Sequence, residues 1–520
     1  MQIEDRSAPS LGRDSGAGND LAAWFLLAVV CGLAWRLVRF ALHFELTGDE
    51  CGIMRSVIER SYAGLLEPLS YSNVSPPMFL WLTKFVDSVF RSEWAVRLIP
   101  LLAGFGAVAV FGLICRDALE GAGRWVAWAV FCVSYVPVTE GTRVKGYTID
   151  LFVATLMLWW TMRWLLNGRH ARYLAWLAVC APVFVWLSYT AVFIVGGVGI
   201  ALAACALKAR GDHEKLGRGN VLAGLAFAGL AGVSVILLYE LNVRLGLQAS
   251  VGNGLADGWK RGYPPLDQPW TVPMWLLSAH TGRGFAWPIG ENHFGSTLTF
   301  VLWAAGLAVW WRRGNRWLWA LFAAPQALSL AAAFLHKYPY LQNPRISMFL
   351  GPGICVFAGA GAQYLIDTFG GVRSGALYRL TAVALAFCAL AGIGRDVAMR
   401  VREIRGPGIR SALAEAGELI GPDGQFVELN DGSASGVFTY YMERGVKQKV
   451  WRFGEGPQIA PGAKVALVAA ATGGASVDAD GLFAAFERRI GRPLKTTWSE
   501  MAREVLLDSK DTVVVRVCAP

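Results

Sequence analysis

Apolar residues along the chain gather in long runs that are separated by short polar gaps. A helix needs about 20 apolar residues to cross about 30 Å of hydrocarbon. Runs of this kind predict eleven membrane-spanning helices, over residues 21–42, 95–115, 125–139, 147–166, 174–189, 191–207, 220–239, 297–311, 317–335, 346–366 and 380–394. Acidic residues precede the first run and no small-residue cleavage pattern follows it, so we interpret it as an uncleaved helix rather than a signal peptide.

Composition supports a polytopic membrane protein. The 520 residues are 55% hydrophobic and only 17% charged, whereas soluble domains are about 25% charged. The 22 tryptophans and 27 phenylalanines are typical of aromatic belts at membrane surfaces. This composition excludes a disordered chain, a coiled coil and an ordinary cytosolic enzyme. The nine cysteines form no CxxC or Cys/His pattern, which argues against a metal or disulfide framework.

The positive charges predict the orientation of the helices. The net charge of +10 does not indicate nucleic-acid binding, because the basic residues lie in short gaps after every second apolar run. The positive-inside rule places these gaps in the cytoplasm together with the N-terminal tail, residues 1–20. The remaining segments then face outward, namely loops 43–94, 139–146, 240–296 and 336–345 and the tail 395–520.

The tail differs from the rest of the chain in its pattern. Helical spacing over 409–420 and 482–490 alternates with strand-like runs at 425–429, 465–469 and 512–517. Such alternation is typical of a small α/β domain. We therefore predict a transmembrane domain over 21–394 and an outer α/β domain over 395–520, which carries neither a phosphate loop nor a nucleophile elbow.

Two adjacent carboxylates, Asp49 and Glu50, follow the first predicted helix directly. Carboxylates at a membrane surface are costly unless they are solvated or paired. Arg36 and Arg39 lie three residues apart, hence on one helix face near the same end. The functional interpretation is an acid/base or metal site backed by cations. The alternative is that the arginines snorkel and the acids are ordinary loop charges.

Two outer loops carry cations against the positive-inside trend. The cations are Arg143 and Lys145 in loop 139–146 and Arg345 in loop 336–345. Other candidate residues accompany them, namely Glu140, Tyr147 and Asp150 near the first loop and Tyr338 in the second. Phosphate is a natural ligand for such cations, and a lipid-phosphate head group could join the two loops. Alternatively, the cations bind anionic lipid nonspecifically or pair with the acids.

Two further segments of the outer loops are candidates. Residues 77–90 are too short to cross the membrane and predict an amphipathic helix at the interface, with Lys84 and Asp87 on its wet side; the alternative is a plain surface or re-entrant segment. His280, Glu291 and His293 lack the HExxH spacing of a zinc site. They are interpreted as polar loop residues or as contacts to an acceptor.

Taken in order, several of these motifs resemble one family. They are Asp49-Glu50, Ser75-Pro76-Pro77, Ser92 to Leu98 followed by Pro100, Arg143 to Tyr147 with Asp150, and Tyr338-Pro339 with Arg345, Leu350 and Pro352. From about residue 30 to 365 the chain resembles the bacterial GT-C glycosyltransferases related to protein O-mannosyltransferases and the lipid A aminoarabinose transferase. The tail, with Tyr440-Tyr441, resembles their periplasmic domain. Thr47-Gly48 and Gly146 depart from the usual pattern, which blurs the substrate class.

The resemblance implies an inverting enzyme of the bacterial inner membrane, with a cytoplasmic N-terminus and a periplasmic C-terminal domain. Its donor would be a sugar on a polyprenyl phosphate such as undecaprenyl phosphate. Its acceptor would be a glycolipid, a glycan or a protein, in cell-envelope glycan or lipopolysaccharide modification. No cofactor is required by the sequence, and a divalent cation such as Mg²⁺ or Mn²⁺ stays open.

The resemblance also implies roles for the candidate residues. Asp49 would be the general base, and Glu50 would orient it or bind the acceptor. Arg143, Lys145 and Arg345, with Tyr147 and Tyr338, would hold the donor phosphate. Arg36, Arg39, Lys84, Glu140 and Asp150 are supporting candidates. A transporter or flippase for a lipid-linked substrate is the main alternative, although paired repeats and charges at the membrane midplane are more typical of transporters. A scaffold protein with a membrane anchor would not need eleven helices.

Overall fold

The structure is a computed structural model of the full chain. It describes residues 15–69, 74–167, 169–211, 217–246, 259–290, 294–314, 316–405, 409–429, 448–451, 463–471, 478–490, 493–503 and 512–519.

All eleven apolar runs are helical. Their helices are α1 (Ser15–Leu42), α4 (Glu93–Ala118), α5 (Gly123–Val133), α7 (Tyr147–Leu166), α8 (Ala171–Leu187), α9 (Ala191–Gly211), α10 (Arg218–Leu238), α14 (Gly295–Arg312), α15 (Arg316–Phe334), α16 (Gly351–Gly370) and α17 (Ser374–Arg405). Within the described residues, six helical stretches are long and apolar enough to cross a membrane, one of them being Met348–Arg402, which contains both α16 and α17; α5, α8 and residues 191–207 of α9 are shorter apolar helices. The chain is thus a multi-pass membrane protein, as its composition predicts.

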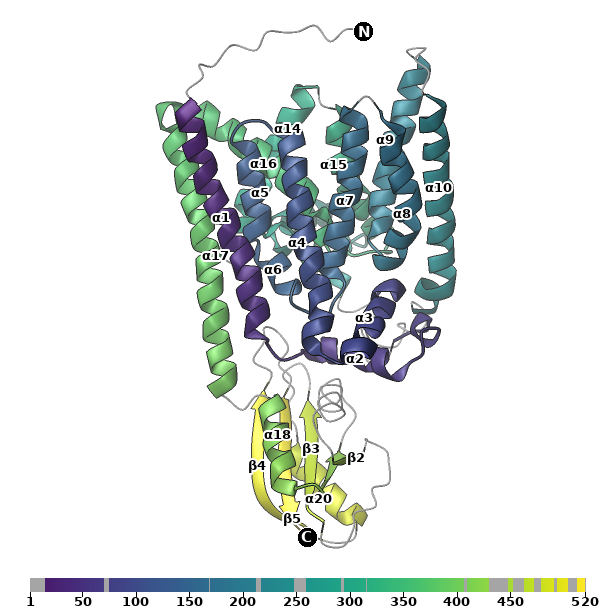
Figure 1. The fold of residues 1–520 in the computed structure, drawn as a ribbon, viewed down its shortest axis with the longest axis vertical. Helices are drawn as coiled ribbons and strands as arrows, with labels where there is room; N and C mark the ends of the chain where they lie inside the picture. The colour runs from purple at the N-terminus through teal and green to yellow at the C-terminus, as the bar shows by residue number, and fades with distance from the viewer. Residues whose placement is uncertain are drawn as a thin grey trace.

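The helices stand side by side in one bundle and alternate in direction (Figure 1). The basic gaps between the predicted helices therefore lie at one end of the bundle, and the predicted outer loops lie at the other, with the C-terminal domain. Short helices line this second end, which we call the loop end: α2 (Gly48–Glu59), η1 (Gly64–Leu66), α3 (Pro77–Phe90), α6 (Tyr135–Glu140), the π turn η2 (Tyr239–Val243), η3 (Lys260–Gly262), η4 (Pro269–Thr271), α13 (Val272–Thr281), η5 (Arg283–Phe285) and η7 (Met348–Leu350). A further turn, η8 (Gly371–Arg373), joins α16 to α17 at the opposite end.

The predicted helix 125–139 is wrong as a single element. It breaks at Ser134, whose backbone is extended, so that α5 ends at Val133 and α6 begins at Tyr135. Pro137 has no N–H to continue the helical ladder. The Tyr135 N–H instead donates to the Pro288 carbonyl of the outer loop 240–296, at 3.1 Å.

Helix α3 is confirmed as an element, but its polar residues do not form the predicted wet side. Asp87 is buried, and Lys84 donates to the Val57 carbonyl of α2 at 2.7 Å. The exposed side chains of α3 include Leu82, Phe85 and Val89. The polar residues therefore attach α3 to the protein, and an apolar stripe faces outward.

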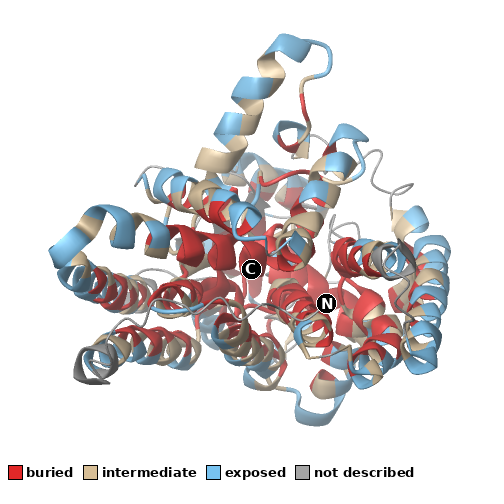
Figure 2. Cartoon of the chain, turned by 90° about the horizontal axis from the view of Figure 1, so that it is seen from above, coloured by how far each residue is buried: buried red, intermediate tan, exposed pale blue. Residues whose placement is uncertain are grey.

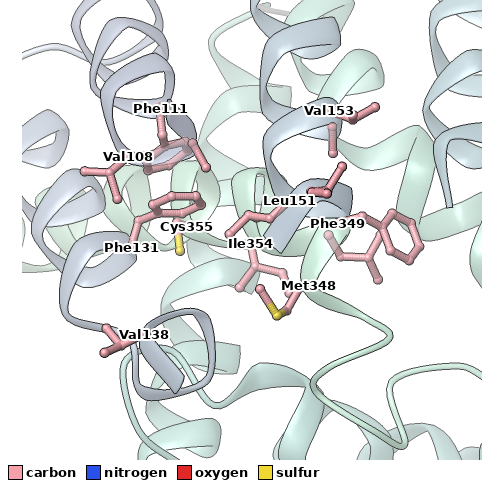
Figure 3. Close-up of a cluster of buried hydrophobic side chains, with 14 of the residues drawn as sticks. Val108, Phe111, Phe131, Val138, Leu151, Val153, Met348, Phe349, Ile354 and Cys355 are labelled. Carbon is pink, nitrogen blue, oxygen red and sulfur yellow. The ribbon is translucent and has the colours of Figure 1, made fainter. Parts of the chain in front are cut away.

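The core of the bundle is aromatic and tightly packed. Phe111 of α4 and Phe131 of α5 stack with ring centroids 4.1 Å apart, and Cys355 of α16 lies beside them (Figure 3). Viewed along the bundle, buried residues fill its centre and exposed residues its rim (Figure 2). Helices α14 and α16 approach closely at Gly306 and Gly361, where a Cβ would lie 1.8 Å from a carbonyl oxygen of the facing helix.

The C-terminal domain is a small α/β unit, as the sequence predicts. It contains α18 (Ile409–Ile420), β1 (Gln425–Glu428), β2 (Lys449–Trp451), β3 (Val465–Ala471), α20 (Ala479–Ile490), β4 (Lys495–Arg503) and β5 (Thr512–Ala519). The sheet order is β2-β1-β3-β5-β4, with β1 parallel to β2 and β3, and β5 antiparallel to β3 and β4. Phe483 and Phe486 of α20 pack on this sheet. Tyr440 and Tyr441 lie outside the described residues.

Candidate functional site

The acid pair begins helix α2 at the loop end of the bundle. Glu50 is the third residue of this helix, and its Oε2 accepts hydrogen bonds from the Thr47 N–H at 3.0 Å and the Thr47 hydroxyl at 2.9 Å. This reciprocal contact is typical of a helix N-terminus, where unpaired backbone N–H groups favour a carboxylate. Thr47, one of the departures from the family pattern, therefore fixes the Glu50 side chain.

Glu50 also joins α2 to the loop before α7. Its Oε1 accepts a hydrogen bond from the Val144 N–H at 2.8 Å, although the two residues are 94 positions apart. The Glu50 side chain is buried, with 1% exposure. Because both of its oxygens accept hydrogen bonds, the Glu50 side chain is fixed and connects the two segments.

Asp49 lies beside Glu50 and faces outward. Its side chain is 65% exposed, and its Oδ2 lies 3.6 Å from the buried Lys145 ammonium. An exposed carboxylate that is held by one cation is accessible to a substrate hydroxyl. Of the two acids, Asp49 is therefore the one placed for chemistry.

Glu140, at the end of α6, brings two arginines together. Its Oε1 lies 3.2 Å from Arg143 and 3.1 Å from the Nε of Arg345 in the other outer loop. Its Oε2 is buried and has no hydrogen-bond partner among the described residues. The two outer loops with unexpected cations thus meet at one carboxylate.

Arg97 belongs to this cluster, although it is absent from the residues proposed from the sequence. It is buried on α4, near Glu50, and among the neighbouring cations it lowers the Glu50 pKa most. The signal that could have found it is its position inside an apolar run, where a charged residue is costly and marks a functional site.

The cluster sets the ionisation of its members. Lys145 lowers the pKa of Asp49, with help from Arg345 and Arg143. Burial alone would raise the pKa of Glu50, but Arg97, Arg143 and the backbone N–H groups of Thr47 and Val144 together lower it. Burial lowers the pKa of Lys145, and the neighbouring carboxylates oppose this. Both acids are therefore ionised at neutral pH.

The cluster carries one more positive than negative charge. Its acids are Asp49, Glu50 and Glu140, and its bases are Arg97, Arg143, Lys145 and Arg345. Arg345, with 29% of its side chain exposed, and the exposed Asp49 make this excess positive charge accessible from outside. The arrangement therefore favours binding of one anionic group.

The remaining candidates at the start of α7 and in loop 336–345 lie close to this cluster. Tyr147 is within electrostatic reach of Glu140, Arg345 and Asp49. Asp150 is buried one turn further along α7, and its Oδ1 has no hydrogen-bond partner among the described residues. The Tyr338 hydroxyl donates to the Ile346 carbonyl at 2.8 Å, so it stabilises its own loop.

The structure places the supporting arginines of α1 away from the acid pair. Arg36 donates to the carbonyls of Gly32, at 3.0 Å, and of Cys132. Arg39 forms a buried ion pair with Asp396 of α17 at 2.7 Å. These contacts connect helices within the bundle. Lys84 is likewise engaged with α2, as described above.

His280 belongs to a buried polar contact that fixes α13. Its Nδ1 donates to the Leu276 carbonyl at 2.8 Å, and its Nε2 lies 3.1 Å from the Tyr340 hydroxyl, which also accepts from Gln326 at 2.9 Å. Burial lowers the pKa of His280, which keeps it neutral. Glu291 and His293 lie outside the described residues.

The donor set around Asp49 and Glu50 does not suit a divalent cation. Hard cations take six or more oxygen ligands, whereas both Glu50 oxygens already accept hydrogen bonds and four cations surround the pair. In the described part of the chain, no group of three or more His, Cys, Asp or Glu side chains could hold a metal ion.

Comparison with known proteins identifies the fold. No family model and no curated protein sequence matches the chain. Among solved structures, ArnT from Cupriavidus metallidurans in the apo state matches with a TM-score of 0.55 and 13% identity, covering 95% of this chain and 98% of that one. The chain has the GT-C fold. The fold expected from the resemblance is thereby confirmed over nearly the full length of both chains.

Two further structures match with similar identity. ArnT from the same organism bound to undecaprenyl phosphate gives a TM-score of 0.52 at 12% identity, again covering 95% of this chain and 98% of that one. An oligosaccharyltransferase from Archaeoglobus fulgidus gives a TM-score of 0.47 at 13% identity, covering 83% of this chain and 62% of that one.

Proposed function

We propose that this protein is an inverting glycosyltransferase of the bacterial inner membrane. It moves a sugar from a polyprenyl-phosphate donor to an acceptor hydroxyl at the periplasmic face. The observation that carries the proposal is the cluster around Asp49, where an exposed carboxylate adjoins buried cations with a net positive charge at one end of a GT-C bundle. The ArnT structure with undecaprenyl phosphate supports a lipid-phosphate donor.

In this reaction Asp49 is the general base. It takes the proton from the acceptor hydroxyl while the hydroxyl oxygen bonds to the anomeric carbon from the face opposite the phosphate. The bond between that carbon and the phosphate oxygen breaks, and its electron pair stays on the phosphate. A positioned base of this kind contributes about 10²–10⁴-fold to the rate.

Donor binding strengthens the base. Lys145 holds Asp49 ionised in the empty site. A phosphate that binds Lys145 brings a negative charge close to Asp49 and weakens that stabilisation, which raises the Asp49 pKa. Asp49 therefore becomes a better proton acceptor when the donor is in place.

The leaving phosphate is stabilised by Arg143, Lys145 and Arg345. Glu140 holds both arginines through one carboxylate oxygen, so their remaining N–H groups keep a fixed geometry. Such preorganised donors stabilise charge that develops in the transition state, and removing one costs about 10²–10³-fold in rate. Tyr147 adds a hydrogen-bond donor at the same place. Arg36, Arg39 and Lys84 act through the packing of the bundle.

The partners follow from this location. The donor's polyprenyl tail stays in the bilayer, and its phosphate reaches the cluster at the membrane surface. The acceptor is a glycolipid, a glycan or a protein of the cell envelope, and the C-terminal α/β domain, which begins with α18 at Ile409 after the end of α17, faces the periplasm with it. The N-terminus is cytoplasmic, as the basic gaps at the opposite end of the bundle favour.

Mass spectrometry of reaction products tests the proposal. Purified protein in lipid vesicles is incubated with a panel of polyprenyl-phosphate sugars and an outer-membrane glycolipid. We expect sugar transfer, or slow donor hydrolysis, in the parent and none in Asp49→Asn, which folds normally. Asp267→Asn, at another exposed acid of the loop end, is the matched control and retains activity.

Two outcomes would contradict the proposal. Normal turnover by Asp49→Asn would exclude Asp49 as the base. Absence of donor consumption under all conditions, together with gradient-driven movement of the lipid across the vesicle membrane, would establish the transporter alternative. EDTA treatment in the same assay tests whether activity depends on a divalent cation. We expect full activity because the oxygen ligands around Asp49 and Glu50 do not suit such an ion.

A further inference from the structure

Helix α13 and its flanking turns present an apolar stripe to the outside of the protein at the loop end. Trp270 in η4 and Met274 and Leu277 in α13 are 74%, 68% and 49% exposed. They follow one another at spacings of four and three residues, which places them on one helical face. The sequence suggested only a wide outer loop here.

The opposite face of α13 fixes this orientation. Trp275 packs against Phe334 at the end of α15 and against Tyr340, and its Nε1 donates to the Arg261 carbonyl at 3.0 Å. His280 contacts Tyr340, as described above. Because both ends of α13 are attached inward, its apolar stripe is held outward.

Exposed cations lie in the segments next to the stripe. Lys260, Arg261, Arg283 and Lys337 are all exposed, and Asp267 is the one acid in the described residues 259–290 and 335–344. The turn with Lys260 and Arg261 is joined to the segment with Lys337 because Tyr263 stacks on His336 with ring centroids 5.1 Å apart. We call the apolar stripe and these four cations the α13 surface.

Exposed apolar side chains also occur on the two bundle helices that α13 contacts, α14 and α15. Leu335, at the end of α15, is 68% exposed, and Leu298 of α14 is 61% exposed. Helix α13 packs against α14. An outward apolar stripe that joins the flank of a membrane bundle is solvated by lipid rather than by a water-soluble partner.

We infer that the α13 surface is a membrane-interface site for anionic lipid. Trp270, Met274 and Leu277 insert among the acyl chains, and Lys260, Arg261, Arg283 and Lys337 bind the phosphates of anionic head groups. Basic segments beside an apolar helix face are attracted to anionic lipid. The contact holds the segment that leads to Arg345 at the bilayer surface. It does not depend on the reaction proposed above.

Fluorescence of a probe on Met274→Cys tests this inference with the full chain in vesicles. An environment-sensitive fluorophore is attached, and the unmodified chain, labelled in parallel, gives the background from the nine native cysteines. We expect blue-shifted emission, as for a probe in lipid. Asp423→Cys, an exposed position in the C-terminal domain, gives the reference for water. Emission at 274 that matches this reference overturns the inference.

Lipid selectivity is the second measurement. Spin-labelled phosphatidylglycerol and spin-labelled phosphatidylcholine are compared as quenchers of the probe at 274. We expect stronger quenching by phosphatidylglycerol, lost at high salt because exposed charges are screened. The difference is also lost in Lys260→Gln/Arg261→Gln/Lys337→Gln. The control Arg312→Gln/Arg313→Gln/Arg316→Gln removes the same charge at the opposite end and keeps the difference. Equal quenching by both lipids in the parent overturns the inference.

Discussion

Lys145 is the residue whose ionisation governs the high-pH side of activity. Its ammonium holds Asp49 and, in our proposal, the donor phosphate. Burial lowers its pKa below the ordinary value of 10.5. The active form is the protonated one, so activity is lost as pH rises through this lowered pKa. We expect the alkaline limb of kcat/KM to lie below pH 10.5, measured as initial rates across a pH series.

The matched variant is Lys145→Arg, because a guanidinium keeps its charge throughout this range. Its alkaline limb should move to higher pH, whatever its absolute rate. Asp49 governs the low-pH side of activity. Its pKa lies below the ordinary 3.8, and its active form is the ionised one. The pH profile of kcat/KM, which reports groups of the free enzyme, should therefore show no acid limb above pH 3.8 from this group. An unchanged alkaline limb in Lys145→Arg would assign that limb to another group.

The sequence indicates which residue types form the site, but not which of them meet. Cations in two outer loops predict an anion site, and the structure brings Arg143 and Arg345 to Glu140. Arg36 and Arg39 fit the same pattern equally well. Arg39 turns inward because Asp396 lies opposite α1, more than 350 positions later in the chain, and Arg36 turns inward to the Cys132 carbonyl of α5. Helical spacing cannot reveal such a partner.

The contact between α1 and α17 rests on a buried ion pair. Asp396 is fully buried and contacts Arg39 at 2.7 Å and the Trp35 indole N–H at 2.7 Å. Removing one partner of a buried pair leaves an uncompensated charge and costs about 3–5 kcal/mol. We expect Asp396→Asn to lower the free energy of unfolding by this amount, measured by thermal or denaturant unfolding in detergent.

An exposed ion pair offers the control for this variant. Arg244 and Glu240 lie 2.7 Å apart on the surface of one helix, and both side chains are about half exposed. Such pairs contribute about 0.3–0.5 kcal/mol, so Glu240→Gln should leave stability nearly unchanged. Similar losses of stability in the two variants would show that the buried α1–α17 ion pair contributes no more to the free energy of unfolding than the exposed pair does.

Close packing between α14 and α16 depends on glycine. A Cβ at Gly306 would lie 1.8 Å from the Phe357 carbonyl oxygen, so Gly306→Ala forces the helices apart. Overpacking of this kind costs about 1–3 kcal/mol. We expect a lower unfolding temperature for Gly306→Ala. The control is Gly224→Ala on α10, where no atom lies within 4 Å of the added Cβ and where alanine favours the helix. Equal stability of the two variants would contradict the role of this contact.

The apolar pattern predicts elements well because membrane helices are long and satisfy their own backbone. The pattern fails where a single contact determines where a helix ends or which of its faces is buried. Helix α5 ends early because the Tyr135 N–H has a partner in another loop. Asp87 is buried, contrary to the predicted amphipathic pattern, because the polar face of α3 packs against the protein and its apolar face is exposed. Strands β2 and β4 were not predicted, as neither shows a clear apolar alternation in the sequence.

At the scale of the whole molecule, the C-terminal domain can be separated from the bundle by truncation after Arg405. This cut keeps Asp396 and the whole of α17. In the described part of the chain, the cluster around Asp49 contains no residue of the C-terminal domain, so donor binding should persist. We expect the truncated protein to keep slow donor hydrolysis and to lose most transfer to the acceptor, measured by mass spectrometry of both products. Equal loss of both activities in a folded protein would contradict a role in acceptor use.

The single excess positive charge of the cluster has a consequence for turnover. A lipid-linked sugar phosphate is a phosphodiester with one negative charge, whereas the lipid phosphate left after transfer is a monoester that carries about −1.5 to −2 at pH 7. Arg143, Lys145 and Arg345 therefore hold the spent carrier more tightly than the incoming donor. We expect product inhibition that deepens from pH 6 toward pH 8, as the monoester loses its second proton with a pKa of about 6. Release of the carrier lipid, rather than transfer of the sugar, would then be the rate-limiting step of turnover.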